Sequence, residues 1–123
     1  MKIAAEALAH ALQSVDGTTL VYRRGLIAIE LIGVSGSTRF DRTNELSEVV
    51  EQFESRDFKI VVADLIHGDT QLWPEEGDEI DEIGCDETLT YQVMAPFGEQ
   101  PWRYADRSRV KMRVHTKQVH RDA

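Results

Sequence analysis

The residue types that most often carry metal chemistry occur in this chain without the spacing that such chemistry needs. The four histidines are His10, His67, His115 and His120. None of them belongs to an HxH, HxxxH or HExxH pattern, and Cys85 is the only cysteine. Zinc sites usually combine clustered Cys and His ligands. We therefore expect no bound metal.

The densest acidic run, Glu75 to Glu87, offers the oxygen ligands that Ca²⁺ prefers. It departs from the EF-hand loop because Asp78, Ile80 and Glu82 take positions one, three and five, which puts an apolar side chain where a ligand is needed. Runs of charge usually form solvated faces or edges that meet a partner. We interpret this run in that way, with a cation between neighbouring subunits as the minor alternative.

Nucleophilic and phosphate-binding motifs are equally incomplete. Ser35-Gly36-Ser37 lacks the Gly-x-Ser-x-Gly elbow that presents a nucleophile. The segment Gly33 to Thr38 is rich in Gly and Ser, but it lacks the Lys that Walker A places beside its Ser or Thr. An ordinary polar segment explains both stretches, so we expect neither an enzyme nor a bound cofactor.

Length and composition describe one small domain. The chain has 123 residues, which fits a single core over residues 1–123. A lone cysteine excludes an intramolecular disulfide, and the N-terminus does not resemble a signal peptide. No segment approaches the roughly 18 apolar residues of a membrane span. The net charge of −8 argues against general nucleic-acid binding, and we expect synthesis in the cytoplasm and no membrane partner.

The charge is distributed unevenly along the chain. Asp64 to Glu87 holds ten carboxylates and no Lys or Arg, whereas Arg103 to Arg121 is strongly basic. Opposite charges on two surfaces of one chain favour a head-to-tail contact between copies, which closes into a ring when the rotation allows. The predicted interface residues are Glu75, Glu76, Asp78, Glu79, Asp81 and Glu82 on the acidic side, and Arg109, Lys111, Arg113, His115 and Lys117 on the basic side.

Secondary structure follows from the periodicity of apolar residues. An Ala- and Leu-rich stretch with apolar residues three and four apart predicts a helix over about residues 2–14, ended by Asp16-Gly17. From about residue 18 to 119 the pattern is typical of β-structure. The expected strands are Thr19–Tyr22, Leu26–Ile32, Glu79–Ile83, Leu89–Ala95 and Val110–Val119.

Two segments between these strands are harder to assign. The polar residues from Ser35 to Asn44 predict an exposed loop. The stretch Leu46 to Leu65 suits either a helix or two strands, and we favour two strands with Ser55-Arg56-Asp57 as a turn or bulge. The expected fold is mainly β, a small antiparallel barrel or sandwich with an N-terminal α-helix.

Period-two alternation sends Val110, Met112 and Val114 to one face of the final strand and its Lys and Arg residues to the other. That basic face predicts a ribbon that meets an acidic partner or passes near DNA phosphates. The alternative is the solvated face of an edge strand, where cations block unwanted pairing. Trp102 and Tyr104 flank Arg103, and such a cluster either stacks on bases or anchors a strand end in the core.

An ordered set of short motifs runs through the second half of the chain. Its members are Pro74-x-x-Gly77-Asp78-x-Ile80, Tyr91-x-Val93-Met94, Pro101-Trp102-Arg103-Tyr104-x-Asp106 and the basic strand ending in His115-Thr116-Lys117. Ser55-Arg56-Asp57-Phe58 and Ala63-Asp64-Leu65 precede them. Over roughly residues 45 to 119 the chain resembles small head-tail joining, or head-closure, proteins of tailed bacteriophages and prophages.

This resemblance implies a non-catalytic β-barrel subunit of the virion, arranged as a homo-oligomeric ring in the phage neck. Its partners are then copies of itself, the portal or adaptor protein, and tail proteins, while DNA passes nearby without specific binding. Two alternatives remain. One is a tail-completion or tail-terminator protein, and the other is a small single-stranded nucleic-acid-binding barrel that uses the basic strand with Trp102 and Tyr104.

Overall fold

The computed structural model describes residues 17–122, and the predicted helix over residues 2–14 lies outside them. The described part contains strands and two 3-10 turns, and no α-helix. The long strands are β1 (Thr18–Arg24), β2 (Ile27–Thr43), β3 (Val49–Val61) and β9 (Lys111–Asp122). The shorter elements are β4 (Ile66–His67), β5 (Thr70–Gln71), β6 (Glu79–Ile83), β7 (Thr88–Val93), β8 (Trp102–Tyr104), η1 (Val62–Asp64) and η2 (Pro96–Gly98).

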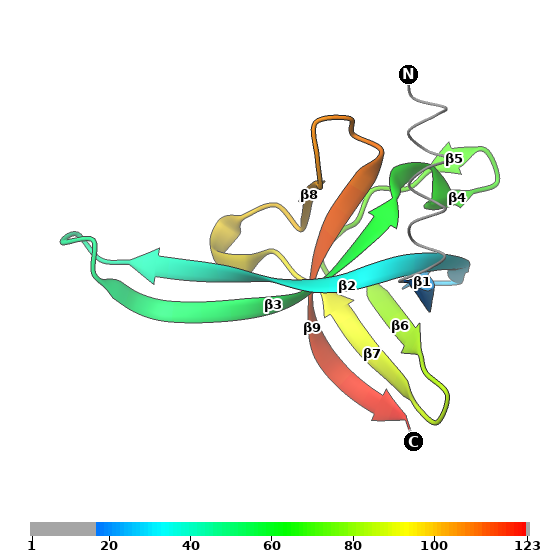
Figure 1. Ribbon diagram of the computed structural model, residues 1–123, viewed down its shortest axis with the longest axis horizontal. Helices are drawn as coiled ribbons and strands as arrows, with labels where there is room; N and C mark the ends of the chain where they lie inside the picture. Colours follow the sequence, from blue (N-terminus) through cyan, green and yellow to red (C-terminus); the bar gives the residue numbers. More distant parts are fainter. Residues whose placement is uncertain (1–16, 123) are drawn as a thin grey trace.

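Seven of these strands form one antiparallel sheet that curls into a barrel-like ring (Figure 1). The order β3-β2-β1-β6-β7-β9 returns to its start because β9 also pairs with β3. The first half of β9 lies between β3 and β8, and its second half pairs with β7. The prediction of a mainly β, antiparallel fold is confirmed, and the barrel-or-sandwich alternative resolves to a barrel-like ring.

The interior of this ring is apolar because the barrel strands alternate in polarity. Each strand turns every second side chain inward. The largest completely buried side chains are Tyr22, Phe58, Leu20, Ile60, Leu65, Ile80 and Met112. Burying a large apolar side chain stabilises a fold by about 1.5–3 kcal/mol. Val110, Met112 and Val114 are all buried, as the alternation in the final strand predicts.

The polar segment from Ser35 to Asn44 is not a loop, and this prediction was wrong. β2 continues to Thr43, and each residue from Gly33 to Arg42 lies opposite one residue of β3. The connecting loop covers only residues 44–48. The side chains are exposed on both faces of the hairpin from Asp41 onward, whereas Thr38 and Phe40 are half-buried. The ladder to β3 satisfies the backbone groups, so the polarity of the segment does not reflect an irregular backbone.

The expected turn or bulge at Ser55-Arg56-Asp57 was also wrong. These residues lie inside β3, opposite Ser37, Gly36 and their neighbours on β2. Arg56 and Asp57 also pair with β9, so β3 is a central strand at this point. The side chains of Ser55 and Asp57 form a buried contact. In the sequence alone, the same residue types are typical of a turn.

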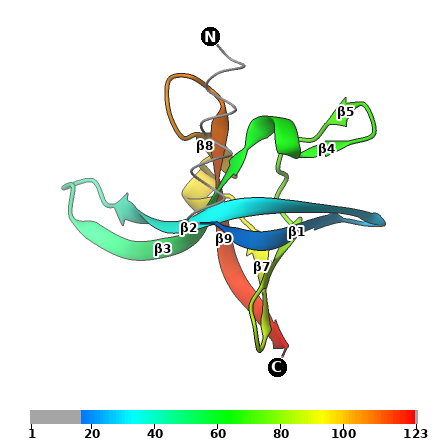
Figure 2. The same cartoon turned by 45° about the vertical axis from the view of Figure 1, so that its right-hand side comes forward.

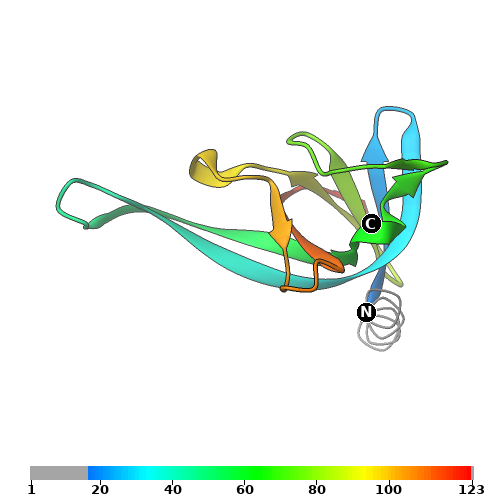
Figure 3. The same ribbon diagram turned by 90° about the horizontal axis from the view of Figure 1, so that it is seen from above.

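The β2–β3 hairpin is longer than the barrel needs. Its distal half, residues 39–54, projects from the ring as a two-stranded arm (Figures 1 and 3). All side chains from Asp41 to Gln52 are exposed. We call this part of the hairpin the arm. The β8–β9 hairpin projects in a different direction, as Figure 2 also shows.

Candidate interaction surfaces and a buried polar cluster

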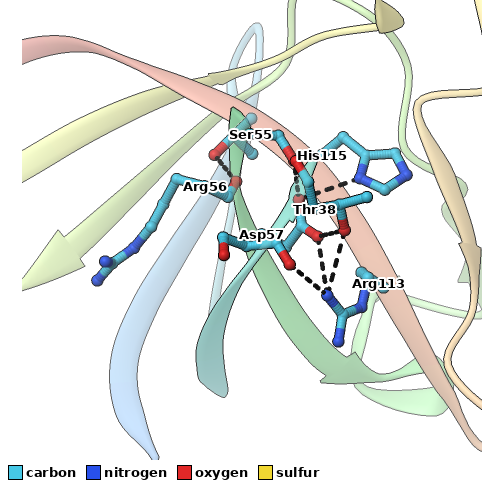
Figure 4. A network of polar contacts seen from close by, with 8 residues as sticks. Thr38, Ser55, Arg56, Asp57, Arg113 and His115 are labelled. Carbon is cyan, nitrogen blue, oxygen red and sulfur yellow. Dashed lines mark hydrogen bonds and ion pairs between the residues drawn. The ribbon is translucent and has the colours of Figure 1, made fainter. Parts of the chain in front are cut away.

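A charged cluster is buried where β2, β3 and β9 meet (Figure 4). Asp57 on β3 has no solvent exposure. Its carboxylate accepts hydrogen bonds from the hydroxyls of Ser55 and Thr38. It also pairs with Arg113 Nη1 at 3.0 Å and with His115 Nδ1 at 3.0 Å. The cluster therefore ties the β2–β3 hairpin to β9, which lies more than 50 residues further along the chain.

The environment of Asp57 keeps its carboxyl group ionised. Burial by itself raises the pKa, but hydrogen bonds from His115, Ser55 and Thr38 outweigh it and lower the pKa to about 2. A buried carboxylate that loses its partners becomes strongly destabilising. Asp57 is therefore a structural charge whose partners hold the barrel together at this point.

The geometry of this cluster does not activate a nucleophile. In a Ser-His-Asp triad the histidine lies between the serine and the carboxylate. Here the carboxylate of Asp57 is central, and both Ser55 and Thr38 donate to it directly. His115 meets the edge of Phe40 at 5.0 Å and borders a small cavity of about 350 Å³. The arrangement serves packing and charge satisfaction.

Asp78 is the centre of a second cluster. It directly precedes β6 and contacts side chains of the neighbouring strand β1. The carboxylate is 6% exposed, accepts a hydrogen bond from the hydroxyl of Tyr22, and pairs with Arg24 at 2.8 Å. Burial by itself raises the pKa of Asp78. The hydrogen bonds from Arg24, Tyr22 and the backbone N–H of Glu75 outweigh this effect, so the pKa lies below its ordinary value. Burial and the bond to Asp78 raise the pKa of Tyr22.

The structure gives most of the predicted acidic interface residues partners within their own chain. Arg24 also pairs with Glu75, and Glu76 accepts a hydrogen bond from the backbone of Ala95. Arg23 reaches Asp81 at 2.8 Å and Glu79 at 3.3 Å. Arg56 pairs with Glu82 at 3.4 Å. The charge of these carboxylates on β6 and its preceding turn is therefore largely compensated within the subunit.

The predicted basic face is likewise divided. Arg113 and His115 are committed to Asp57, and His115 is only 3% exposed. Arg109 lies before the strand, with φ of 59°, and its guanidinium sits 5.3 Å from the ring centroid of Tyr104. Lys111 is half-buried and Lys117 is exposed. The five predicted residues therefore do not form one continuous ribbon.

Three aromatic side chains contact one another in succession, and the last of them contacts Arg109. Trp73 stacks on Trp102 with centroids 5.0 Å apart, and Trp102 meets Tyr104 edge-on at 5.0 Å. Trp73 and Tyr104 remain 41% and 36% exposed. We call Trp73, Trp102, Tyr104 and Arg109 the aromatic row. Sequence reasoning found its β8 members but missed Trp73, because the contact joins residues almost 30 positions apart and only Trp73-Pro74 marked the place.

The model of the phage head-tail joining protein family matches residues 1–123 of this chain. The chain belongs to this family. The head-tail joining protein is thus a structural component of the virion, with a role in the phage neck and with head and tail proteins as its partners. None of the curated proteins compared with it matches.

Other classes of site find no support in the described residues of this head-tail joining protein. Between residues 17 and 122 no group of three or more His, Cys, Asp and Glu side chains is arranged to hold a metal ion. Over the same residues no helix is long and apolar enough to cross a membrane. The features that stand out are surfaces, namely the arm and the aromatic row.

Proposed function

We propose that this head-tail joining protein assembles into a homo-oligomeric ring in the neck of a tailed phage, between the portal or its adaptor ring and the tail. The match to the joining-protein family over residues 1–123 carries this proposal. Closed point-group symmetry is the usual outcome for many copies of one soluble chain. The subunit then acts as an adaptor that presents one surface to the head and another to the tail.

The shape of the subunit supports an assembly role. A compact barrel can form the wall of a ring, and the arm extends well beyond it (Figure 1). Three exposed apolar residues lie close together near the tip of the arm, with Leu46 79%, Val49 46% and Val50 50% exposed. Apolar groups that stand out from a barrel in this way are typical of contacts with other chains.

The electrostatics support a passage for DNA rather than a binding site. The net charge of −8 gives a potential that repels phosphates, so DNA can move past the ring without being held. The faces of Trp102 on which bases could stack are already used in part by Trp73. The buried Asp57 cluster also supports a structural role without catalysis.

The direct test is to delete this chain from the phage and to measure whether tails still attach to the heads. We expect filled heads and separate tails to accumulate, and purified protein added to the heads to restore tail attachment. Cryo-electron microscopy of heads incubated with the protein should show added ring density at the portal vertex.

Two results would contradict the proposal. One is normal tail attachment in particles that lack the chain. The other is absence of new density at the portal vertex combined with salt-dependent binding to single-stranded oligonucleotides at physiological ionic strength, which favours the nucleic-acid-binding alternative.

A further inference from the structure

The loop at the end of the arm is well organised although it contacts little else. The Asn44 side-chain oxygen accepts hydrogen bonds from the N–H groups of Leu46 at 2.9 Å and Glu48 at 3.0 Å. The backbone of Asn44 bonds to Glu48 and Ser47 as well. A loop that is already ordered loses less conformational entropy when it binds. The tip is therefore prepared for a contact.

The tip combines apolar and acidic side chains. Leu46, Val49 and Val50 are exposed, and the carboxylates of Glu45 and Glu48 lie beside them. Among residues 17–122 neither glutamate side chain has an ion-pair partner, in contrast to the carboxylates of β6. The chemistry that fits this tip is an apolar surface with cations at its edge.

The aromatic row has that complementary chemistry. Trp73, Trp102 and Tyr104 form a continuous, partly exposed aromatic surface. Arg109 caps one end of the row, and Arg107 is exposed in the same hairpin. Interfaces are enriched in Trp, Tyr and Arg, which supply most of the binding energy.

Both surfaces belong to one chain but lie apart. The tip is at one end of the long axis, whereas the β8–β9 hairpin stands beside the barrel (Figures 1 and 3). A rigid subunit cannot join its own tip to its own row. Because every copy carries one of each, the two surfaces can pair in succession from copy to copy, which gives the head-to-tail contact that builds a ring.

We propose that the arm tip, residues 44–50, of one subunit binds the aromatic row of the adjacent subunit. Leu46 and Val50 cover the aromatic side chains, while Glu45 and Glu48 face Arg107 and Arg109. This contact rests on the proposed ring and specifies which surfaces form it. It replaces the acidic stretch around β6 and the β9 cations as the main charged contact, because those groups are largely satisfied within the subunit.

Disulfide cross-linking in assembled virions tests the contact. In a Cys85→Ser background, virions are prepared with Glu48→Cys and Arg107→Cys in the same chain and are oxidised. We expect a ladder of multimers of this chain on a non-reducing gel. Virions that contain a mixture of the two single variants should give dimers and no higher species, since each chain then carries one thiol.

The chain provides its own matched control. Cys85 is an exposed thiol in the β6–β7 loop, at the end of the barrel away from the β8–β9 hairpin (Figure 1). Arg107→Cys with native Cys85 should give no ladder. A ladder of equal strength from this control, or cross-links only to a different protein, would overturn the proposed contact.

The two levels of the proposal fail separately. Virions that contain the chain but give no Glu48→Cys/Arg107→Cys ladder would refute the arm contact and leave the role in the neck intact. Virions that assemble and attach tails without incorporating the chain would refute the role in the neck.

Discussion

Arg113 on β9 lies 3.0 Å from the buried carboxylate of Asp57 on β3, so a cation expected on the outer face of the final strand instead holds two strands of the barrel together. The pairing changes how the basic C-terminal region is understood. Its charge is divided between a structural task inside the subunit and the exposed cations of the β8–β9 hairpin.

Removing the central carboxylate should damage the fold more than any change on the arm. Asp57→Ala leaves Arg113 and His115 without their partner, and we expect a loss of about 3–5 kcal/mol in the free energy of unfolding, measured by urea denaturation. Glu54→Gln, on the same strand but exposed, should change it by less than about 0.5 kcal/mol. A loss below about 1 kcal/mol for Asp57→Ala would show that the cluster is not structural.

Stability should fall in acid in a way that depends on Asp57. Its pKa is about 2 in the folded protein against an ordinary value of 3.8, so the folded state favours the ionised form. The contribution is fully present above about pH 4 and is lost as the pH falls towards 2, by about 2 kcal/mol. Comparison of wild type with Asp57→Asn from pH 6 to 2.5 should show the difference in unfolding free energy shrinking over this window. A constant difference would be inconsistent with the lowered pKa.

A pair of glycines on β2 should respond differently to the same substitution. A Cβ at Gly33 would lie 2.5 Å from Leu20 Cδ1 and 3.2 Å from the Lys59 carbonyl oxygen, whereas at Gly36 the nearest atom is Arg113 Nη1 at 3.8 Å. We expect Gly33→Ala to cost about 1–3 kcal/mol by overpacking the core. Gly36→Ala should be neutral or slightly stabilising. Thermal unfolding of the two variants measures the contrast, and equal effects would contradict the packing described for Gly33.

Shortening the arm should separate folding from assembly. Replacement of residues 41–52 by Asn-Gly joins Phe40 to Phe53, which lie opposite each other, through a two-residue hairpin turn. Because the removed side chains are exposed, Tm should change by less than about 4 °C. Incorporation into virions, measured by gel analysis of purified particles, should be lost. Normal incorporation would show that the arm is dispensable.

Sequence reasoning located the barrel strands where burial imposes a pattern. Glu79–Ile83 matches β6 at both ends, and the alternation of Val110, Met112 and Val114 correctly marked the inner face of β9. β9 has one apolar face, so its period of two is visible in the sequence. The same reasoning treated residues 35–44 as a loop, because their side chains are mostly polar and no apolar alternation remains.

The Asp57 cluster could not be predicted from local patterns. Asp57 lies beside Ser55 and Arg56, a combination that is common in turns. Its burial depends on Thr38, which is 19 positions away, and on Arg113 and His115, which are more than 50 positions away. Only the pairing of β3 with β9 brings these groups together. The alternation within the final strand alone therefore predicted an exposed basic face.

Within each subunit, β9 is the strand that closes the barrel, and this affects folding during synthesis. β9 closes the barrel by pairing with β3, more than 50 residues earlier, and with β7. Until the ribosome has released β9, both of these strands keep an unpaired edge, and such long-range pairing is slow to form. A subunit can therefore complete its barrel only after β9 has been synthesised. During that interval the nascent chain should be most susceptible to aggregation and most dependent on chaperones.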